Sequence, residues 1–321
     1  MYVLELAGDD DAFAAYEAEC AASAVEVVAP GVATARGITD RVADLAYTHR
    51  VSELVGTCDP AVADASAVLT AASFDREGTI AVRAVDVRGS TGVDTQAAER
   101  ELGSVLVDRG FGVDLDDPDH ELRALFAGDT CLLGWLEAEP ERTFSTRAPG
   151  DRPFFQPGSM DPALARALVN MAGTRPGATV LDPMCGTGGI LIEAGLVGAR
   201  VLGVDAQQKM VTGARRNLTA LLDGEWAVVR GDAASLPVAD DAVDTVVFDT
   251  PYGRQSKIEG ELHSLVADAL EEAHRVAPRC VVVGDRPWAQ LAHQAGWQSE
   301  AAFEQRVHRS LTRYIVVLRR R

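Results

Sequence analysis

Short apolar runs alternate with stretches of helical periodicity along the whole chain. In the first part, this pattern predicts a strand at Tyr2–Leu6, a helix at Asp11–Ala22 and a strand at Val25–Ala29, which is ended by a Pro-Gly pair. We interpret residues 1–47 as a small N-terminal α/β domain.

A second pattern of alternating elements extends from Thr48 to Ala138. The predicted elements are, in order, the helix Pro60–Leu69, the strand Thr79–Val87, the helix Thr95–Arg109 and the strands Gly112–Leu115, Glu121–Phe126 and Thr130–Glu137. We interpret residues 48–138 as a second α/β domain. The polar, proline-containing stretch 139–152 is predicted to be a linker.

Beyond this stretch the order of elements becomes regular. Asp161 and Pro162 begin a helix that Gly173 ends. Strand-like runs separated by helices follow at 179–181, 200–204, 226–229, 245–248 and 280–283, and the runs at 303–307 and 314–318 are close enough to form a hairpin. Such alternation predicts a mostly parallel sheet with helices on both faces and a ligand site at the carboxyl ends of its strands.

Composition excludes several classes of protein. With 321 residues, 47% of them hydrophobic, the chain can bury more than one core. It has neither an apolar run of the ~18 residues that a membrane helix needs nor a signal peptide, so we expect a cytoplasmic protein with no membrane partner. Its five scattered cysteines predict no disulfide framework and no metal site.

The net charge of −18 would ordinarily argue against a nucleic-acid partner, because phosphate contacts need lysine and arginine. However, the chain has 28 aspartates, 28 arginines and only two lysines, and its acidic residues are dispersed along the whole length. Dense carboxylates keep a protein hydrated in concentrated salt, so we interpret the charge as a halophilic adaptation. Binding to a cationic partner is the alternative.

The strongest local motif is Val180-Leu-Asp-Pro-Met-Cys-Gly-Thr-Gly-Gly189, a buried strand that turns through glycines into a helix. Glycines let a ligand approach the backbone, and the N-terminus of the helix supplies free amides. Tight packing or dinucleotide binding also explains a glycine-rich turn of this kind.

Three aspartates at successive strand ends favour S-adenosylmethionine (SAM) as the ligand of this loop. Asp182 can hold the amino group of a cationic cofactor, whereas it would repel a pyrophosphate. Asp205 stands where a carboxylate accepts both ribose hydroxyls, and Asp232 where it can accept a hydrogen bond from the adenine amino group. Each aspartate taken alone is also explained as a turn or cap residue.

The fourth strand ends in Phe248-Asp-Thr-Pro-Tyr-Gly253, which indicates the reaction. The lone pair of an exocyclic amine is delocalised into the base, so the amine needs two acceptors that aim this lone pair at a methyl group. Asp249 and the carbonyl of Thr250 can accept its N–H bonds, Pro251 stiffens the turn, and Tyr252 offers a ring for a flipped base. A plain β-turn is the alternative.

Both motifs resemble those of class I amino-methyltransferases, and the wider chain is similar to the archaeal tRNA guanosine N2-methyltransferases that modify the guanosine at position 10. The similarity lies in residues 152–170, the glycine-rich loop and residues 249–256, while 81–88 with 113–119 resemble the THUMP RNA-binding domain of that family. The resemblance implies a Rossmann-like catalytic domain at 153–321 with a seven-stranded sheet, SAM as cofactor and tRNA as partner. The family tetrapeptide Asp-Pro-Pro-Tyr has Thr250 at its second position here.

From the motifs and the resemblance together we expect the following site. The residues that bind the amine and the base are Asp249, Thr250, Pro251 and Tyr252. The residues that hold SAM are Asp182, Pro183, Cys185, Gly186, Thr187, Gly188, Gly189, Asp205, Ala206, Asp232, Ala233 and Phe155, with Phe154 beside Phe155 in the pocket wall. Candidate phosphate contacts are Arg83, Arg88, Arg123, Arg306, Arg309, Arg313 and residues 319–321, although solvated positions explain them equally well.

Other functions remain open at this point. An adenine N6-methyltransferase would use the same Asp-Thr-Pro-Tyr turn, so it is the first alternative. A tRNA-binding protein that has lost catalysis is the second, although it would need a broken loop or turn. A nicotinamide enzyme is the third, although it would have no use for Asp182 beside the loop. We expect a monomer.

Overall fold

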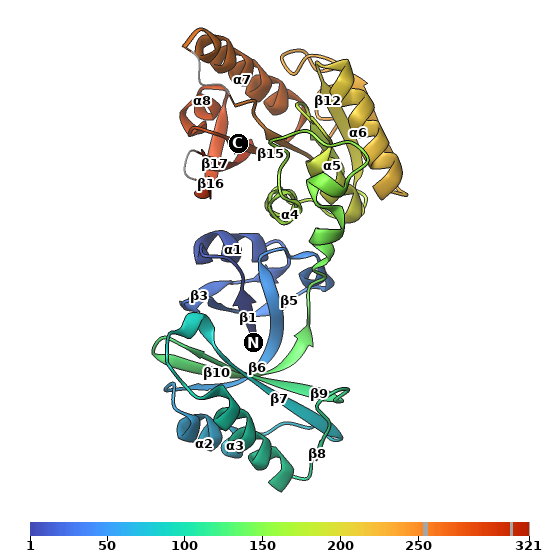
Figure 1. Ribbon diagram of the computed structural model, residues 1–321. Coiled ribbons are helices and arrows are strands. Elements are labelled where there is room, and N and C mark those ends of the chain that lie inside the picture. Colours follow the sequence, from blue (N-terminus) through green and yellow to red (C-terminus); the bar gives the residue numbers. More distant parts are fainter. Residues whose placement is uncertain (253–255, 309–310, 321) are drawn as a thin grey trace. The chain divides into compact units, whose positions relative to one another are not determined.

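The computed structural model describes residues 1–252, 256–308 and 311–320, except for the side chains of 256–259 and 308 (Figure 1). The chain forms two compact units, Met1–Glu141 and Arg142–Arg321. Within the described ranges no helix is long and apolar enough to cross a membrane.

The first unit is built on an eight-stranded sheet in the order β3-β4-β1-β6-β10-β9-β7-β8. Its strands are β1 (Tyr2–Leu6), β3 (Glu26–Ala29), β4 (Val32–Ala35), β6 (Thr48–Cys58), β7 (Thr79–Asp86), β8 (Gly112–Val113), β9 (His120–Ala127) and β10 (Thr130–Ala138). The short strands β2 (Ala22–Ser23) and β5 (Gly37–Ile38) form a separate pair. The helices are α1 (Asp11–Ala18), α2 (Val62–Ala71) and α3 (Thr95–Asp108), with 3-10 turns η1 (Asp40–Asp44) and η2 (Val87–Gly89).

Helices α2 and α3 pack on one face of this sheet (Figure 1). Leu69 and Leu102 from these helices contact the inward side chains of β7, β9 and β10, where Trp135 is 2% exposed. The predicted helices and strands of residues 60–138 are confirmed to within about two residues, because most of their apolar positions recur with the period of a helix or a strand and are buried.

Helix α1 is shorter than predicted, and the strands β2, β4, β5 and β6 were not predicted. Helix α1 ends at Ala18 rather than at Ala22, because the buried carboxylate of Glu17 binds the backbone N–H groups of Ala46 and Tyr47 at 2.8 and 2.7 Å and fixes the last turn. Strand β6 was not predicted, since polar residues interrupt it on both faces. It pairs with β1 and with β10, so one sheet continues across residue 47. The boundary between an N-terminal domain and a THUMP-like domain stays a prediction.

Part of the predicted linker is folded. Residues 142–152 contain the 3-10 turns η3 (Thr143–Arg147) and η4 (Pro149–Asp151) and belong to the second unit. Arg147 donates two hydrogen bonds, of 2.6 and 2.9 Å, to the fully buried carboxylate of Glu193, and Arg166 approaches the same carboxylate to 3.1 Å. The polar residues of this stretch therefore form a buried ion-pair cluster.

The second unit contains a seven-stranded sheet in the order β13-β12-β11-β14-β15-β17-β16. Its strands are β11 (Thr179–Asp182), β12 (Arg200–Asp205), β13 (Trp226–Arg230), β14 (Thr245–Asp249), β15 (Arg279–Gly284), β16 (Trp297–His308) and β17 (Leu311–Arg320). The helices are α4 (Pro162–Met171), α5 (Gly189–Leu196), α6 (Gln208–Leu221), α7 (Ser256–Val276) and α8 (Ala289–Gln294). Strands β11 to β15 are parallel, and β16 and β17 form the predicted antiparallel hairpin. The Rossmann-like prediction is confirmed.

The order of strands places the ligand site. From β11 the chain passes through α5 to β12 on one side of β11, whereas β14 lies on the other side. The order of strands therefore changes direction at β11. In parallel sheets a crevice opens at such a point, at the carboxyl ends of the strands. Asp182 ends β11 and Asp249 ends β14, so the two aspartates come from neighbouring strands and flank this crevice.

Candidate active site

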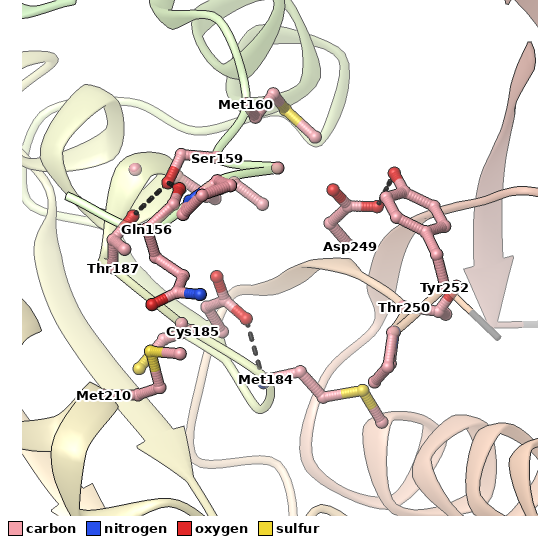
Figure 2. Close-up of a pocket in the computed structure, with 17 residues that line it drawn as sticks. Gln156, Ser159, Met160, Met184, Cys185, Thr187, Met210, Asp249, Thr250 and Tyr252 are labelled. Carbon is pink, nitrogen blue, oxygen red and sulfur yellow. Dashed lines mark hydrogen bonds between the residues drawn. The ribbon is translucent and has the colours of Figure 1, made fainter. Parts of the chain in front are cut away.

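The glycine-rich loop and the Asp-Thr-Pro-Tyr turn line one cavity of about 220 Å³. The lining residues are Gln156 to Met160, Asp182, Met184 to Thr187, Gly189, Ile190, Met210 and Asp249 to Tyr252. Figure 2 shows Asp249 and Tyr252 across the cavity from Gln156 and Thr187. The fold thus brings together two motifs that are about sixty residues apart in the sequence.

The backbone of the loop needs glycine. Gly186 and Gly188 have φ angles of 50° and 81°, in the left-handed region where a Cβ atom is strained. The loop is fastened to β12 by the N–H of Cys185, which donates to the carbonyl of Val204 at 3.0 Å. Helix α5 begins directly after Gly188, so its N-terminus faces the cavity at Gly189.

Asp205 fastens the same loop. One of its carboxylate oxygens accepts from the N–H of Gly186 at 3.0 Å, and the other accepts from the N–H of Gln207 at 2.8 Å. Both oxygens retain free lone pairs. The side chain is largely buried and does not line the cavity, so contact with ribose hydroxyls stays a prediction.

Asp182 places a buried carboxyl group in the lining of the cavity. The residue is 2% exposed, and its carboxylate accepts one hydrogen bond, 3.0 Å long, from the N–H of Met184. Burial raises the pKa of this carboxyl well above its ordinary value, and the charges of Asp205 and Asp249 raise it further. A buried carboxylate is stabilised by a cation. A ligand with a positive amino or sulfonium group therefore fits this position.

The turn after β14 holds Asp249 and Tyr252 in a hydrogen-bonded pair. The hydroxyl of Tyr252 donates to Oδ1 of Asp249 at 2.6 Å, as Figure 2 shows. Burial raises the pKa of Asp249 to about 6, although this hydrogen bond and the charge of Arg313 act in the opposite direction. Asp249 is therefore ionised at neutral pH while facing a partly desolvated cavity.

Thr250 is anchored in a way that proline would not allow. Its backbone N–H donates to the carbonyl of Val283 on β15 at 2.8 Å, and proline has no such donor. Its hydroxyl accepts a hydrogen bond of 3.3 Å from the indole N–H of Trp288, which is buried. A Cβ atom on Gly284 would lie 2.6 Å from the threonine Oγ1, so glycine leaves room for this contact. These hydrogen bonds hold the turn in position, as the ring of a second proline would.

The loop from 152 to 160 contributes residues that sequence reasoning missed. Fully buried Asn217 on α6 binds both the N–H and the carbonyl of Phe154, at 2.8 and 2.9 Å, and also the carbonyl of Thr187 at 2.9 Å. Ser159 and Thr187 share a further hydrogen bond of 3.1 Å (Figure 2). One amide side chain therefore joins this loop to the glycine-rich loop. The family-like run that begins at Arg152 was the only signal for it in the sequence.

Several predicted residues lie away from the cavity. Phe154 is placed over Gly213, where a Cβ atom would come within 2.0 Å of its ring, and Phe155 is 49% exposed. Neither phenylalanine lines the cavity, and Gln156 to Met160 do so instead. Pro183, Gly188, Asp205, Ala206, Asp232 and Ala233 also lie outside the lining. Their roles in cofactor binding stay predictions.

The arginines considered for phosphate contact in the first unit already have partners. Arg83 donates to the carbonyl of Leu115 at 2.6 Å, Arg88 pairs with Asp11 at 2.6 Å, and Arg123 pairs with Glu5 at 2.8 Å. Arg309 and Arg321 lie outside the described residues. In the described part of the chain no group of three or more His, Cys, Asp or Glu side chains could hold a metal ion.

Comparisons with known proteins agree with this geometry. Residues 149–315 match the RMKL-like methyltransferase domain family. The chain is 37% identical to the tRNA (guanine(10)-N2)-dimethyltransferase of Methanothermobacter thermautotrophicus over 284 residues, which cover 86% of this chain and 83% of that protein. It is 32% identical to the enzyme of the same name from Pyrococcus abyssi, covering 76% and 75% of the two chains. The crystal structure of TrmN from Thermus thermophilus has the same fold, with a TM-score of 0.53, 23% identity and coverage of 100% and 99%.

Proposed function

Because this chain belongs to the tRNA (guanine(10)-N2)-dimethyltransferase family, we propose that it methylates N2 of the guanosine at position 10 of tRNA and adds up to two methyl groups. The protein is a SAM-dependent tRNA (guanine-N2) methyltransferase. One observation supports the proposed reaction. The glycine-rich loop and the Asp-Thr-Pro-Tyr turn line the same cavity, so a cofactor on the loop would lie beside a base on the turn.

The cofactor site that we propose uses the charge and shape of the loop. Asp182 offers the buried carboxylate that the amino group of the methionine part needs, and Gly186 to Gly189 allow close approach to the backbone. Asp205 and Asp232 remain the proposed contacts for ribose and adenine. When bound, SAM supplies an electrophilic methyl group on a sulfonium.

The turn after β14 activates the amine. Oδ2 of Asp249 and the carbonyl of Thr250 accept the two N–H bonds of guanine N2, which draws the nitrogen out of conjugation and directs its lone pair at the methyl group. Methylation would leave N2 with an extra proton, which the Asp249 carboxylate would accept and release to solvent. The ring of Tyr252 supports the flipped base.

Replacement of Asp205 by alanine is expected to weaken SAM binding. The change removes the proposed acceptor for the ribose hydroxyls and also the two backbone hydrogen bonds that hold the loop at Gly186 and Gln207. Hydrogen bonds to a charged group contribute about 1.5–3 kcal/mol each, less what water recovers. Calorimetry with SAM measures the effect. An unchanged affinity would remove Asp205 from the site.

The first unit is proposed to position the tRNA. Residues 81–88 and 113–119 resemble the THUMP RNA-binding domain, so we expect the catalytic unit without them to bind tRNA weakly. A fragment of residues 142–321, which forms a compact unit with its own sheet, should bind SAM with near-normal affinity yet methylate tRNA far more slowly than the full chain. If the fragment and the full chain methylate tRNA at equal rates when tRNA is limiting, the first unit does not position the tRNA.

One reaction tests the proposed function directly. The full chain is incubated with SAM and unmodified tRNA in concentrated KCl, which suits an acidic surface adapted to salt, and the tRNA is then digested to nucleosides. N2-methylguanosine or N2,N2-dimethylguanosine, mapped to position 10 and absent from a tRNA with adenosine there, is the expected product. N6-methyladenosine would instead establish the adenine reaction, and no product would favour a non-catalytic binding protein. We also propose that the protein is a monomer and works in the cytoplasm.

A further inference from the structure

Arg313 is a buried cation that the sequence motifs did not connect with the catalytic turn. It lies on β17 and is 5% exposed, and its Nε atom donates to the hydroxyl of Tyr252 at 3.0 Å. Its Nη2 atom lies 3.9 Å from Oδ2 of Asp249, which is an ion-pair distance but too long for a hydrogen bond. Only β15 separates β17 from β14 in the sheet, so the strand order brings this arginine to the turn.

The hydrogen bonds around the Tyr252 hydroxyl have a fixed direction. A guanidinium group can only donate, so the hydroxyl accepts from Arg313 and must give its single proton to Oδ1 of Asp249. Oδ1 is then occupied, while Oδ2 keeps its lone pairs for an N–H of the substrate amine. Without the arginine, a protonated Asp249 can instead donate to the hydroxyl, which leaves Oδ2 as an uncharged and weaker acceptor for the amine.

The charges around Asp249 make this arginine important. Among the described residues, the titratable groups that face Asp249 are Tyr252 on the same turn, Arg313 on β17, Asp285 after β15 and Asp182 at the end of β11. The two carboxylates favour the neutral form of Asp249, and within this described group only Arg313 is a cation. Even with Arg313 in place, burial raises the pKa of Asp249 to about 6.

We propose that Arg313 is a positioning residue, which orients the Tyr252 hydroxyl and keeps Asp249 an ionised acceptor for the substrate amine. This inference rests on the proposed function, in which Asp249 binds the amine. It replaces the phosphate contact considered for Arg313 from the sequence, because the side chain is buried against the turn.

The test is the dependence of kcat on pH, measured for the full chain with saturating SAM and tRNA between about pH 5 and about pH 9. The acid limb of the wild-type chain should follow Asp249, whose pKa is about 6. Arg313→Met should move this limb upward by about one pH unit or more, with kcat recovering at alkaline pH. Arg313→Lys, which retains the charge, should move it less. Arg313→Gln, which keeps an N–H donor without charge, repeats the test if the methionine variant does not fold.

Arg319→Met is the matched control, because Arg319 lies on the same strand, its side chain is 62% exposed and it pairs with Glu300. Its pH profile should equal that of the wild type. SAM affinity should change less than about twofold in all variants, since Arg313 does not line the cavity. An acid limb that stays in place in the folded neutral variants overturns the role of Arg313. A wild-type chain that does not methylate tRNA contradicts the proposed function itself, so the two failures are distinguishable.

Discussion

Replacement of Asp249 by alanine is expected to lower kcat for tRNA methylation by about 10²-fold or more, the scale for losing one preorganised electrostatic group. The amine of guanine must leave conjugation before it attacks, so its acceptor matters more in the transition state than in the ground state. SAM affinity should change little, because Asp182 and the glycine-rich loop are intact. Single-turnover methylation at saturating SAM, together with calorimetry of SAM binding, measures both quantities.

Asp249→Asn is the control for this prediction. Asparagine has nearly the same shape and keeps one carbonyl oxygen as acceptor, but it cannot take up a proton at neutral pH. Its kcat should fall between those of the wild type and the alanine variant, and the acid limb near the pKa of about 6 should disappear. Near-normal turnover by Asp249→Ala would mean that the Asp-Thr-Pro-Tyr turn is structural and that the chemistry lies elsewhere.

Replacement of Tyr252 by alanine is expected to impair capture of the base as well as turnover. Losing a stacking platform costs about 1–3 kcal/mol per base, so KM for tRNA should rise by roughly tenfold or more. The hydroxyl that occupies Oδ1 of Asp249 is lost at the same time, which lowers kcat. Steady-state kinetics with varied tRNA separates the two parameters and sets this variant apart from Asp249→Ala.

Tyr252→Phe separates the ring from the hydroxyl. Phenylalanine keeps the stacking surface, so KM for tRNA should stay within about twofold of the wild type while kcat falls. The residue is 37% exposed, so either substitution should leave the fold intact. If Tyr252→Ala has the same KM for tRNA as Tyr252→Phe, the ring does not support the base.

The sequence alone predicted most elements of the second unit because its strands are apolar runs bounded by turns. Val180–Leu181 and Val246–Phe248 are buried by helices on both faces, and such burial leaves a continuous apolar signature. Polar residues on both faces interrupt β6, so it lacks this signature and was missed. The sheet of the first unit, which continues through β6, was therefore not apparent.

The two motifs of the site were predictable for a local reason. The glycines of the loop and the Asp-Thr-Pro-Tyr turn determine backbone conformation over a few residues, and neighbouring parallel strands place their carboxyl ends side by side. Sequence reasoning therefore placed Asp182 and Asp249 at the crevice. It did not name the five residues that follow Phe155, Gln156 to Met160, which line the cavity, and the role of Phe155 stays a prediction.

Long-range contacts could be found only in the tertiary structure. Arg313 reaches Tyr252 across 61 residues of sequence because β17 inserts between β15 and β16, and Asn217 joins Phe154 to Thr187 across 63 and 30 residues. The sequence thus determined the chemistry of the site, since residue types and local turns specify donors, acceptors and a close approach to the backbone. The tertiary structure decided which buried partners orient those groups, because hydrogen bonds between distant segments depend on strand order and packing, which no local pattern encodes.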